Sequence, residues 1–236
     1  MQVKPILKWA GGKSQLTSAI EARMPETFRQ KSFTYIEPFI GGGAMFFWLK
    51  SNYNIKNAVI NDVNSDLINC YRVVQTNVDE LIEGLTDYQD RYHGLCADTD
   101  AKKQFYYNVR HAFNEKLSSD VEKAVQLIFL NKTCFNGLYR VNRSGSFNVP
   151  IGSYKKPKIS DPENLKLAAK AFEDTEILCG DYAEIIKYAD PRSLFYMDPP
   201  YKPISATSSF NAYAKDSFDD KEQIRLSKFC RELSAN

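Results

Sequence analysis

Strand-like and helix-like segments alternate along this chain, and that alternation limits its fold more than any other feature. Short apolar runs predict buried strands at 33–37, 58–61, 176–179 and 193–197. Apolar periodicity predicts helices at 44–50, 65–75, 182–188 and 219–233. Strands that alternate with helices are typical of the α/β class, so we expect an α/β sheet with helices packed against it.

A helical insertion interrupts this alternation. From about Asp79 to Phe135 the pattern is helical, and turn-rich sequence continues to Pro157. The connecting segments are short, so the insertion should pack closely against the rest of the chain. We therefore expect three parts, at 1–76, 77–160 and 161–236.

The composition narrows the class of protein. With 236 residues and 43% hydrophobic content, the chain can bury a full core. No apolar run is long enough to cross a membrane and the N-terminus has no secretory signal pattern, so we expect a cytoplasmic protein. The five cysteines are scattered and form no Cys-x-x-Cys pair, which predicts neither a disulfide framework nor a metal site.

One segment is strongly basic, although the whole chain carries a net charge of only +2. Residues 123–160 contain no acid but seven positive charges, those of Lys123, Lys132, Arg140, Arg143, Lys155, Lys156 and Lys158. Aromatic residues are interleaved with them, namely Phe135, Tyr139, Phe147 and Tyr154. A charged run is usually a solvated face, but this mixture favours a nucleic acid, with Lys155 and Lys156 as candidates for phosphate contacts.

The motif Asp198-Pro199-Pro200-Tyr201 follows the last predicted strand. In an open α/β sheet, ligands bind at the carboxyl ends of the strands. Asp198 and the Pro199 carbonyl can each accept one N–H of an exocyclic amino group, and Tyr201 offers a ring for stacking. The motif therefore fits an adenine base, although a rigid turn would explain the tetrapeptide alone equally well.

A glycine-rich loop from Glu37 to Gly43 joins the first strand to the first helix, and Asn61-Asp62 end the next strand. Glycines let the backbone approach a ligand closely, and the acid can bind both hydroxyls of a ribose. A nucleoside site is predicted, although a tight turn and a helix cap would account for the same residues. The dinucleotide fingerprint fails because Phe46 replaces its third glycine, which disfavours a pyrophosphate ligand.

A second glycine turn carries Lys13 toward a helix, with Trp9 beside it. Gly12-Lys13-Ser14 match the end of a phosphate-binding loop, but Leu7 occupies the position of its first glycine. The turn could instead cover a nucleoside and attract a carboxylate. A solvated helix start explains it equally well.

Six motifs, in this order, resemble those of the DNA adenine N6-methyltransferases of the alpha arrangement, the family that methylates GATC. They are Lys8–Lys13, Glu37–Gly43, Asn61–Asp62, Asn136–Arg140, Phe147–Pro150 and Asp198–Tyr201. The resemblance covers nearly the whole chain. It implies a Rossmann-like, S-adenosylmethionine-dependent methyltransferase sheet in two halves, with a DNA-recognition subdomain, helical plus hairpin, inserted at 77–160.

The resemblance also implies roles for individual residues. Catalysis would fall to Asp198, Pro199, Pro200 and Tyr201. The cofactor S-adenosyl-L-methionine would be bound by Trp9, Lys13, Glu37, Pro38, Phe39, Gly41, Gly43, Asp62, Asp181 and Asp198. Double-stranded DNA would be contacted by Lys8, Phe135, Asn136, Leu138, Arg140 and Pro150. Arg140 would read a guanine, since arginine can pair bidentately with O6 and N7.

The family's sheet continues beyond the helix that ends near Leu233, so we expect its C-terminal strands to be missing here. One alternative is therefore a DNA-binding fragment that no longer transfers methyl groups. A less favoured one is a protein-glutamine N-methyltransferase, against which an aspartate at position 198 weighs. We expect a monomer on duplex DNA at a GATC-type site. The sequence leaves open the exact recognition sequence and any tolerance of single-stranded DNA. It also leaves open whether the protein serves a restriction system, a phage or general marking of DNA.

Overall fold

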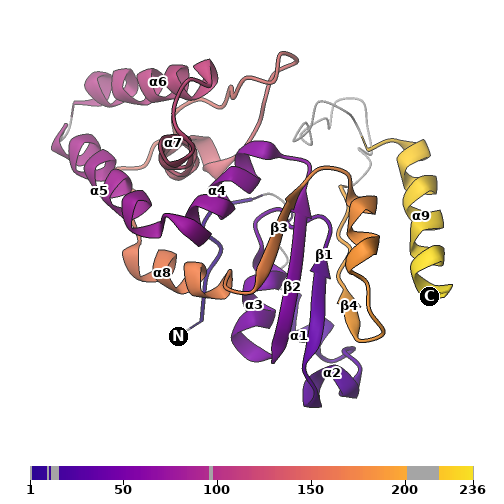
Figure 1. The fold of residues 1–236 in the computed structure, drawn as a ribbon. Helices are drawn as coiled ribbons and strands as arrows, with labels where there is room; N and C mark the ends of the chain where they lie inside the picture. The colour runs from indigo at the N-terminus through magenta and orange to yellow at the C-terminus, as the bar shows by residue number, and fades with distance from the viewer. Residues whose placement is uncertain (1, 10, 12–15, 96–97, 201–217, 236) are drawn as a thin grey trace.

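Four parallel strands form the centre of the molecule. The computed structural model describes residues 2–9, 11, 16–95, 98–200 and 218–235, and Figure 1 shows their arrangement. The strands are β1 (Phe33–Glu37), β2 (Ile55–Asp62), β3 (Thr175–Cys179) and β4 (Ser193–Phe195). Their order is β3-β2-β1-β4, and every pair is parallel. The carboxyl ends of the strands therefore meet at one edge of the sheet.

Helices cover both faces of this sheet because its strands are apolar on both sides. On one face lie α3 (Ala44–Asn52), α4 (Ser65–Thr76) and α8 (Pro162–Ala171), which share a core with Tyr35 and Ile60. On the other face, α9 (Asp220–Ala235) and the 3₁₀ helix η2 (Tyr182–Tyr188) pack against Ile36 and Val59. Neighbouring residues of one strand thus point to opposite cores, as the pleat requires.

The insertion consists of three helices and an irregular hairpin. The helices are α5 (Val78–Gly94), α6 (Thr99–Glu115) and α7 (Asp120–Thr133), and the 3₁₀ turn η1 (Phe135–Gly137) follows them. Two isolated antiparallel bridges, Cys134–Ile151 and Val141–Phe147, form the hairpin. Helix α7 packs on α4, and the insertion shares one continuous core with the sheet, so the close packing expected from the short linkers is confirmed.

Most predicted elements occur in the structure, with differences at their ends. β1 has the predicted bounds, whereas β2 begins three residues earlier and β4 ends two residues earlier than expected. Residues 182–188 form a 3₁₀ rather than an α-helix, in which the Glu184 amide bonds to the Asp181 carbonyl. A helix was expected after Lys13 without stated bounds, and α1 (Thr17–Glu21) lies there; α2 (Glu26–Gln30) and α8 were not predicted. β4 is paired with β1 alone among the described strands.

The structure tests the expected absence of membrane-spanning helices and of disulfides only in the residues that it describes. Within the described residues, no helix is both long and apolar enough to span a bilayer. Four of the cysteines are placed there as free thiols: Cys70, Cys134, Cys179 and Cys230. Cys96 lies outside the described residues.

The core beneath α3 depends on one aromatic side chain. Phe172 is fully buried, and its ring lies 5.2 Å from that of Phe46 and 5.3 Å from that of Tyr71. Phe172→Ala should lower the free energy of unfolding by about 3–5 kcal/mol, because it removes these contacts and leaves a cavity. Urea unfolding measures this loss. Leu117→Ala, at an 87% exposed position, should change it by less than about 0.5 kcal/mol; equal effects of both substitutions would contradict this packing.

Candidate active site and DNA-binding face

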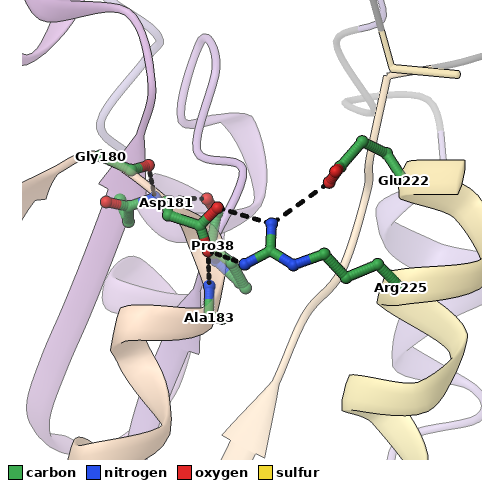
Figure 2. Close-up of polar contacts among 7 residues, drawn as sticks. Pro38, Gly180, Asp181, Ala183, Glu222 and Arg225 are labelled. Atoms are coloured by element: carbon green, nitrogen blue, oxygen red, sulfur yellow. Dashed lines mark hydrogen bonds and ion pairs between the residues drawn. The ribbon is translucent and has the colours of Figure 1, made fainter.

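A buried asparagine joins two of the loops at the carboxyl edge of the sheet. Asn61, at the end of β2, donates from Nδ2 to the carbonyls of Pro38 (3.1 Å) and Gly180 (3.0 Å). Pro38 follows β1 and Gly180 follows β3, and both are labelled in Figure 2. Asn61 is 2% exposed, so breaking either bond would leave a buried polar group unpaired. The two loops are therefore held at a fixed separation.

The glycine loop after β1 is shaped for close contact with Trp9. Gly41 and Gly43 have φ angles of +46° and +69°, which side-chain-bearing residues rarely adopt, and Gly43 is the N-cap of α3. A Cβ atom on Gly42 would lie 2.8 Å from Cβ of Trp9. The Trp9 ring in turn stacks on Tyr139 with centroids 5.2 Å apart. Trp9 of the N-terminal motif thus lies in contact with the glycine loop.

A cavity of about 770 Å³ opens at this edge of the sheet. Its wall includes most of the residues predicted to hold a cofactor, namely Trp9, Glu37, Pro38, Phe39, Gly41, Gly43, Asp62, Asp181 and Asp198. The described lining carries six carboxylates, those of Glu37, Asp62, Asp66, Asp181, Asp198 and Glu222. The described basic lining residues are Lys116 and Arg225. A surface with this imbalance attracts a cationic ligand and repels a phosphate.

Glu37 is the most deeply buried acid of the cavity wall. Its Oε2 accepts a hydrogen bond of 2.7 Å from the Tyr35 hydroxyl. Burial raises the pKa of Glu37 well above its ordinary value, and the nearby charge of Asp198 raises it further, while the Tyr35 bond opposes the increase. The cavity therefore holds a carboxylate whose ionisation a bound positive charge would favour.

Asp62 is oriented by the loops on both sides of it. Its carboxylate accepts from the amides of Gly41 (3.0 Å, Oδ2) and Asn64 (2.9 Å, Oδ1). Burial still raises its pKa, against the effect of these backbone bonds. A carboxylate has about four acceptor positions, so Asp62 can also accept from a ligand hydroxyl.

The Asp-Pro-Pro motif lies beside this cavity. β4 ends at Phe195, and the Tyr196 amide bonds to the Ile36 carbonyl of β1 at 2.9 Å. Asp198, Pro199 and Pro200 follow and line the cavity. The structure thus brings the catalytic candidates next to the cofactor candidates. Tyr201 and Lys13, which were also predicted to belong to the site, lie outside the described residues.

An exposed apolar edge lies on the hairpin of the insertion. The Phe135 amide donates to the Pro150 carbonyl at 2.9 Å, which places these two residues side by side. Phe135 is 52% exposed, Pro150 and Asn136 are exposed, and Leu138 is half-buried. Asn136 has a φ angle of +55°, so the chain turns sharply at this edge. A large exposed ring at a sharp turn is suited to contact another molecule.

Two basic residues are positioned by contacts within this region. Arg140 donates from Nε to Oδ1 of Asn148 at 2.7 Å, across the hairpin. Lys8 is exposed, and its Nζ lies 3.3 Å from the Tyr154 hydroxyl and 4.7 Å from the centre of that ring. Its stem crosses Gly137 so closely that a Cβ atom there would lie 2.3 Å from Lys8 Cδ. Lys155 and Lys156 are exposed nearby in sequence.

The structure corrects the role of two aromatic residues of the basic segment. Tyr139 and Phe147 were expected to alternate with the charges on a binding face, but they are 6% and 2% exposed. Their rings lie 5.8 Å apart in the core, and the Tyr139 hydroxyl donates to Asp66 at 2.9 Å. They were misassigned because their partners are distant in sequence. Phe135 and Tyr154 keep solvent-accessible surface.

A family model settles what kind of protein has this arrangement. The model of the D12 class N6 adenine-specific DNA methyltransferases matches residues 9–236. The chain belongs to this family. The resemblance inferred from six motifs is thereby confirmed, and with it the Rossmann-like α/β class of the sheet.

Relatives of this adenine-specific DNA methyltransferase align along nearly its whole length. It is 50% identical over 236 residues to type II methyltransferase M.MjaIII of Methanocaldococcus jannaschii, with 99% of this chain and 81% of the relative covered. It is 38% identical over 240 residues to type II methyltransferase M1.LlaDCHI of Lactococcus lactis, with coverage of 100% and 78%. It is 35% identical over 230 residues to DNA adenine methylase of Escherichia coli K12, with coverage of 98% and 76%.

Sequence reasoning missed several residues of this methyltransferase's cavity. Among them are Lys116, Phe218, Glu222 and Arg225. Arg225 makes a bidentate ion pair with Asp181, with both N···O distances 2.7 Å (Figure 2). Arg225 and Glu222 stand three residues apart on a helix, which is indistinguishable from an ordinary solvated face. No local signal could have assigned them to the site.

Glu37 gives this site a measurable pH dependence. Its folded-state pKa exceeds its unfolded-state value of about 4.3, so its unfavourable effect on stability is absent below that pH and grows as the pH rises toward the folded pKa. Glu37→Gln keeps an acceptor for Tyr35 but cannot ionise. The free energy of unfolding of Glu37→Gln should therefore rise relative to that of the parent as the pH increases from 4.5 to 8.

Urea unfolding across this range measures the gain. Glu83→Gln, an exposed acid on α5, is the matched control and should show no such trend. If the free energies of unfolding of Glu37→Gln and the parent differed by the same amount at every pH, the pKa of Glu37 would not be raised by folding.

Proposed function

We propose that this methyltransferase transfers a methyl group from S-adenosylmethionine to N6 of an adenine that it flips out of duplex DNA, within a GATC-type site. The observation that carries the proposal is the acidic cavity directly beside Asp198, Pro199 and Pro200. A methyl donor and an acceptor base can meet there without further rearrangement of the strands.

The cavity suits the cofactor by size and by charge. Its volume of about 770 Å³ lies within the usual range for small-molecule sites. S-adenosylmethionine, when bound, supplies an electrophilic methyl group on a positively charged sulfur. The carboxylates of the wall would neutralise that charge and the ligand's ammonium group. Asp62 would accept the ribose hydroxyls. Phe39 and Phe218, whose rings pack edge-to-face with centroids 6.0 Å apart, would form one apolar side of the adenine pocket.

The adenine that receives the methyl group has two N–H donors on N6, so the cavity wall needs two hydrogen-bond acceptors to bind them. The N6 lone pair of adenine is delocalised into the ring, so the amino group is a poor nucleophile. The Asp198 carboxylate and the Pro199 carbonyl would each accept one N–H, which favours a localised lone pair directed at the donor methyl. Unstacking the base should cost a few kcal/mol, and stacking on Tyr201 would offset roughly 1–3 kcal/mol of it.

The exposed side of the insertion would contact the duplex. In this proposal residues 77–160 form the target-recognition subdomain, and 1–76 and 161–236 form the cofactor and catalytic halves. Phe135, Asn136, Leu138 and Pro150 would enter the opened helix, while Lys8 and Arg140 would contact bases. Lys155 and Lys156 would bind phosphates. All these residues lie on one chain, so the enzyme would act as a monomer on DNA.

Transfer of labelled methyl groups to GATC duplexes tests the proposal. The parent chain should label an unmethylated duplex and leave one that already carries N6-methyladenine unlabelled. Asp198→Ala should reduce the rate by at least about 10²-fold because it removes one of the two acceptors, while most DNA affinity remains.

Three results would count against the proposal. Full activity of Asp198→Ala would contradict the role of Asp198 as an acceptor for the adenine amino group. Labelling of the premethylated duplex would exclude N6 of that adenine as the target atom. DNA binding without any transfer would favour the alternative of a binding fragment.

Arg140 should determine the preference at one guanine. Arg140→Ala should reduce the preference for guanine over other bases at that position by about 10- to 100-fold, because the N–H donors of Arg140 can pair with both O6 and N7 of guanine. Methylation rates on duplexes substituted at each position of the site measure this. Arg143→Ala, an exposed arginine at the hairpin tip, should instead weaken binding to every duplex in a salt-dependent way. An unchanged preference in Arg140→Ala would place base reading elsewhere.

A further inference from the structure

An ion pair in the cavity wall joins Arg225 of helix α9 to Asp181, which follows β3. Nη1 and Nη2 of Arg225 lie 2.7 Å from Oδ2 and Oδ1 of Asp181, and Nη1 lies 3.3 Å from Glu222 (Figure 2). The guanidinium also lies over the Tyr182 ring, 4.8 Å from its centre. Asp181, Tyr182, Glu222 and Arg225 all line the cavity. The pair is therefore part of the ligand-facing wall.

The bonds of Asp181 are distributed unequally over its two oxygens. Oδ1 accepts from the Ala183 amide at 2.8 Å and from Arg225, while Oδ2 accepts from Arg225. Each carboxylate oxygen can accept about two hydrogen bonds. Within the described part of the chain, these contacts fill Oδ1 and leave one acceptor position on Oδ2. The carboxylate is thus held in one orientation and can still bind a single N–H donor.

We propose that Arg225 is a positioning residue that holds Asp181 as a fixed acceptor for the amino group of the cofactor's adenine, and that this ion pair sets the preference for a 6-amino over a 6-oxo purine. The inference rests on the proposed function. An ionised carboxylate accepts hydrogen bonds but donates none. A purine with an oxygen at position 6 would place one acceptor against another.

The charge of Arg225 supports this role. Its hydrogen bonds are the main cause of the lowered pKa of Asp181, so the pair stabilises the ionised form of the carboxyl, which only accepts hydrogen bonds. The planar guanidinium also matches both carboxylate oxygens at once, which a lysine cannot do.

The pair is not needed to hold α9 in place. Leu226 and Phe229 of the same helix are 8% and 5% exposed in the core formed with Ile36 and Val59. The side chains of Arg225 and Asp181 are 45% and 43% exposed, and ion pairs this accessible to water contribute little to folding. Substitution of Arg225 should therefore alter ligand binding and leave the fold intact.

Calorimetric titration with S-adenosylhomocysteine and with its deaminated analogue, S-inosylhomocysteine, tests the inference. The parent should prefer the adenosyl ligand strongly. Arg225→Ala should bind that ligand about tenfold more weakly and bind the inosyl ligand nearly as the parent does, so the preference narrows. Arg225→Lys should be intermediate. Asp181→Asn, whose amide can donate to an oxygen, should narrow the preference further.

Kinetics and stability separate positioning from folding. Arg225→Ala should raise KM for S-adenosylmethionine about tenfold with little change in kcat, and its melting temperature should match the parent's. Arg231→Ala, an exposed arginine on the same helix, is the matched control and should keep the parent's ligand preference.

Three outcomes would overturn the inference. The first is an equal loss of affinity for both ligands in Arg225→Ala, and the second is an unchanged preference of that variant for the adenosyl ligand. The third is tighter binding of the adenosyl ligand by the variant, which would mean that Arg225 competes with the base for Asp181. A parent chain that binds neither ligand would instead contradict the proposed function itself.

Discussion

The site depends on the buried amide of Asn61 more than on any other single interaction. Its Nδ2 bonds to the carbonyls of Pro38 and Gly180 and so joins the loops after β1 and β3. The next residue, Asp62, binds the Gly41 amide and fixes the glycine loop from the same strand end. Two adjacent residues of β2 therefore hold the loops after β1 and β3, which both belong to the cavity wall. In a buried setting, loss of one such partner leaves an unsatisfied group and costs roughly 1–3 kcal/mol.

Charge is divided between two neighbouring surfaces of the chain. The described cavity wall is mainly acidic, whereas residues 123–160 carry seven positive charges and no acid. A net charge of +2 conceals this separation. The basic segment attracts a phosphate backbone over about a Debye length, while the cavity disfavours phosphate and favours a cation. One small domain can thus bring a polyanion and a cationic ligand together without either occupying the place of the other.

The sequence predicted what local patterns determine. Apolar runs located β1 correctly, and the motif order identified the family, because both depend on neighbouring residues. Helix α8 was missed although Asp161 caps it and Pro162 begins it, which are ordinary start signals. The burial of Tyr139 and the pairing of Arg225 with Asp181 were beyond reach. Each depends on a partner brought close only by the complete fold.

Two consecutive N-terminal residues connect the cavity to the exposed hairpin. The backbone of Lys8 is bonded on both sides by the amide of Asn131, through its N–H at 2.8 Å and its carbonyl at 2.9 Å. From this fixed point the Lys8 side chain crosses Gly137 toward Tyr154, while Trp9 packs on the glycine loop. Asn131 also binds the Gly137 carbonyl at 2.9 Å. Through these three hydrogen bonds, Asn131 of α7 joins the backbone just before Trp9 to the turn at Gly137.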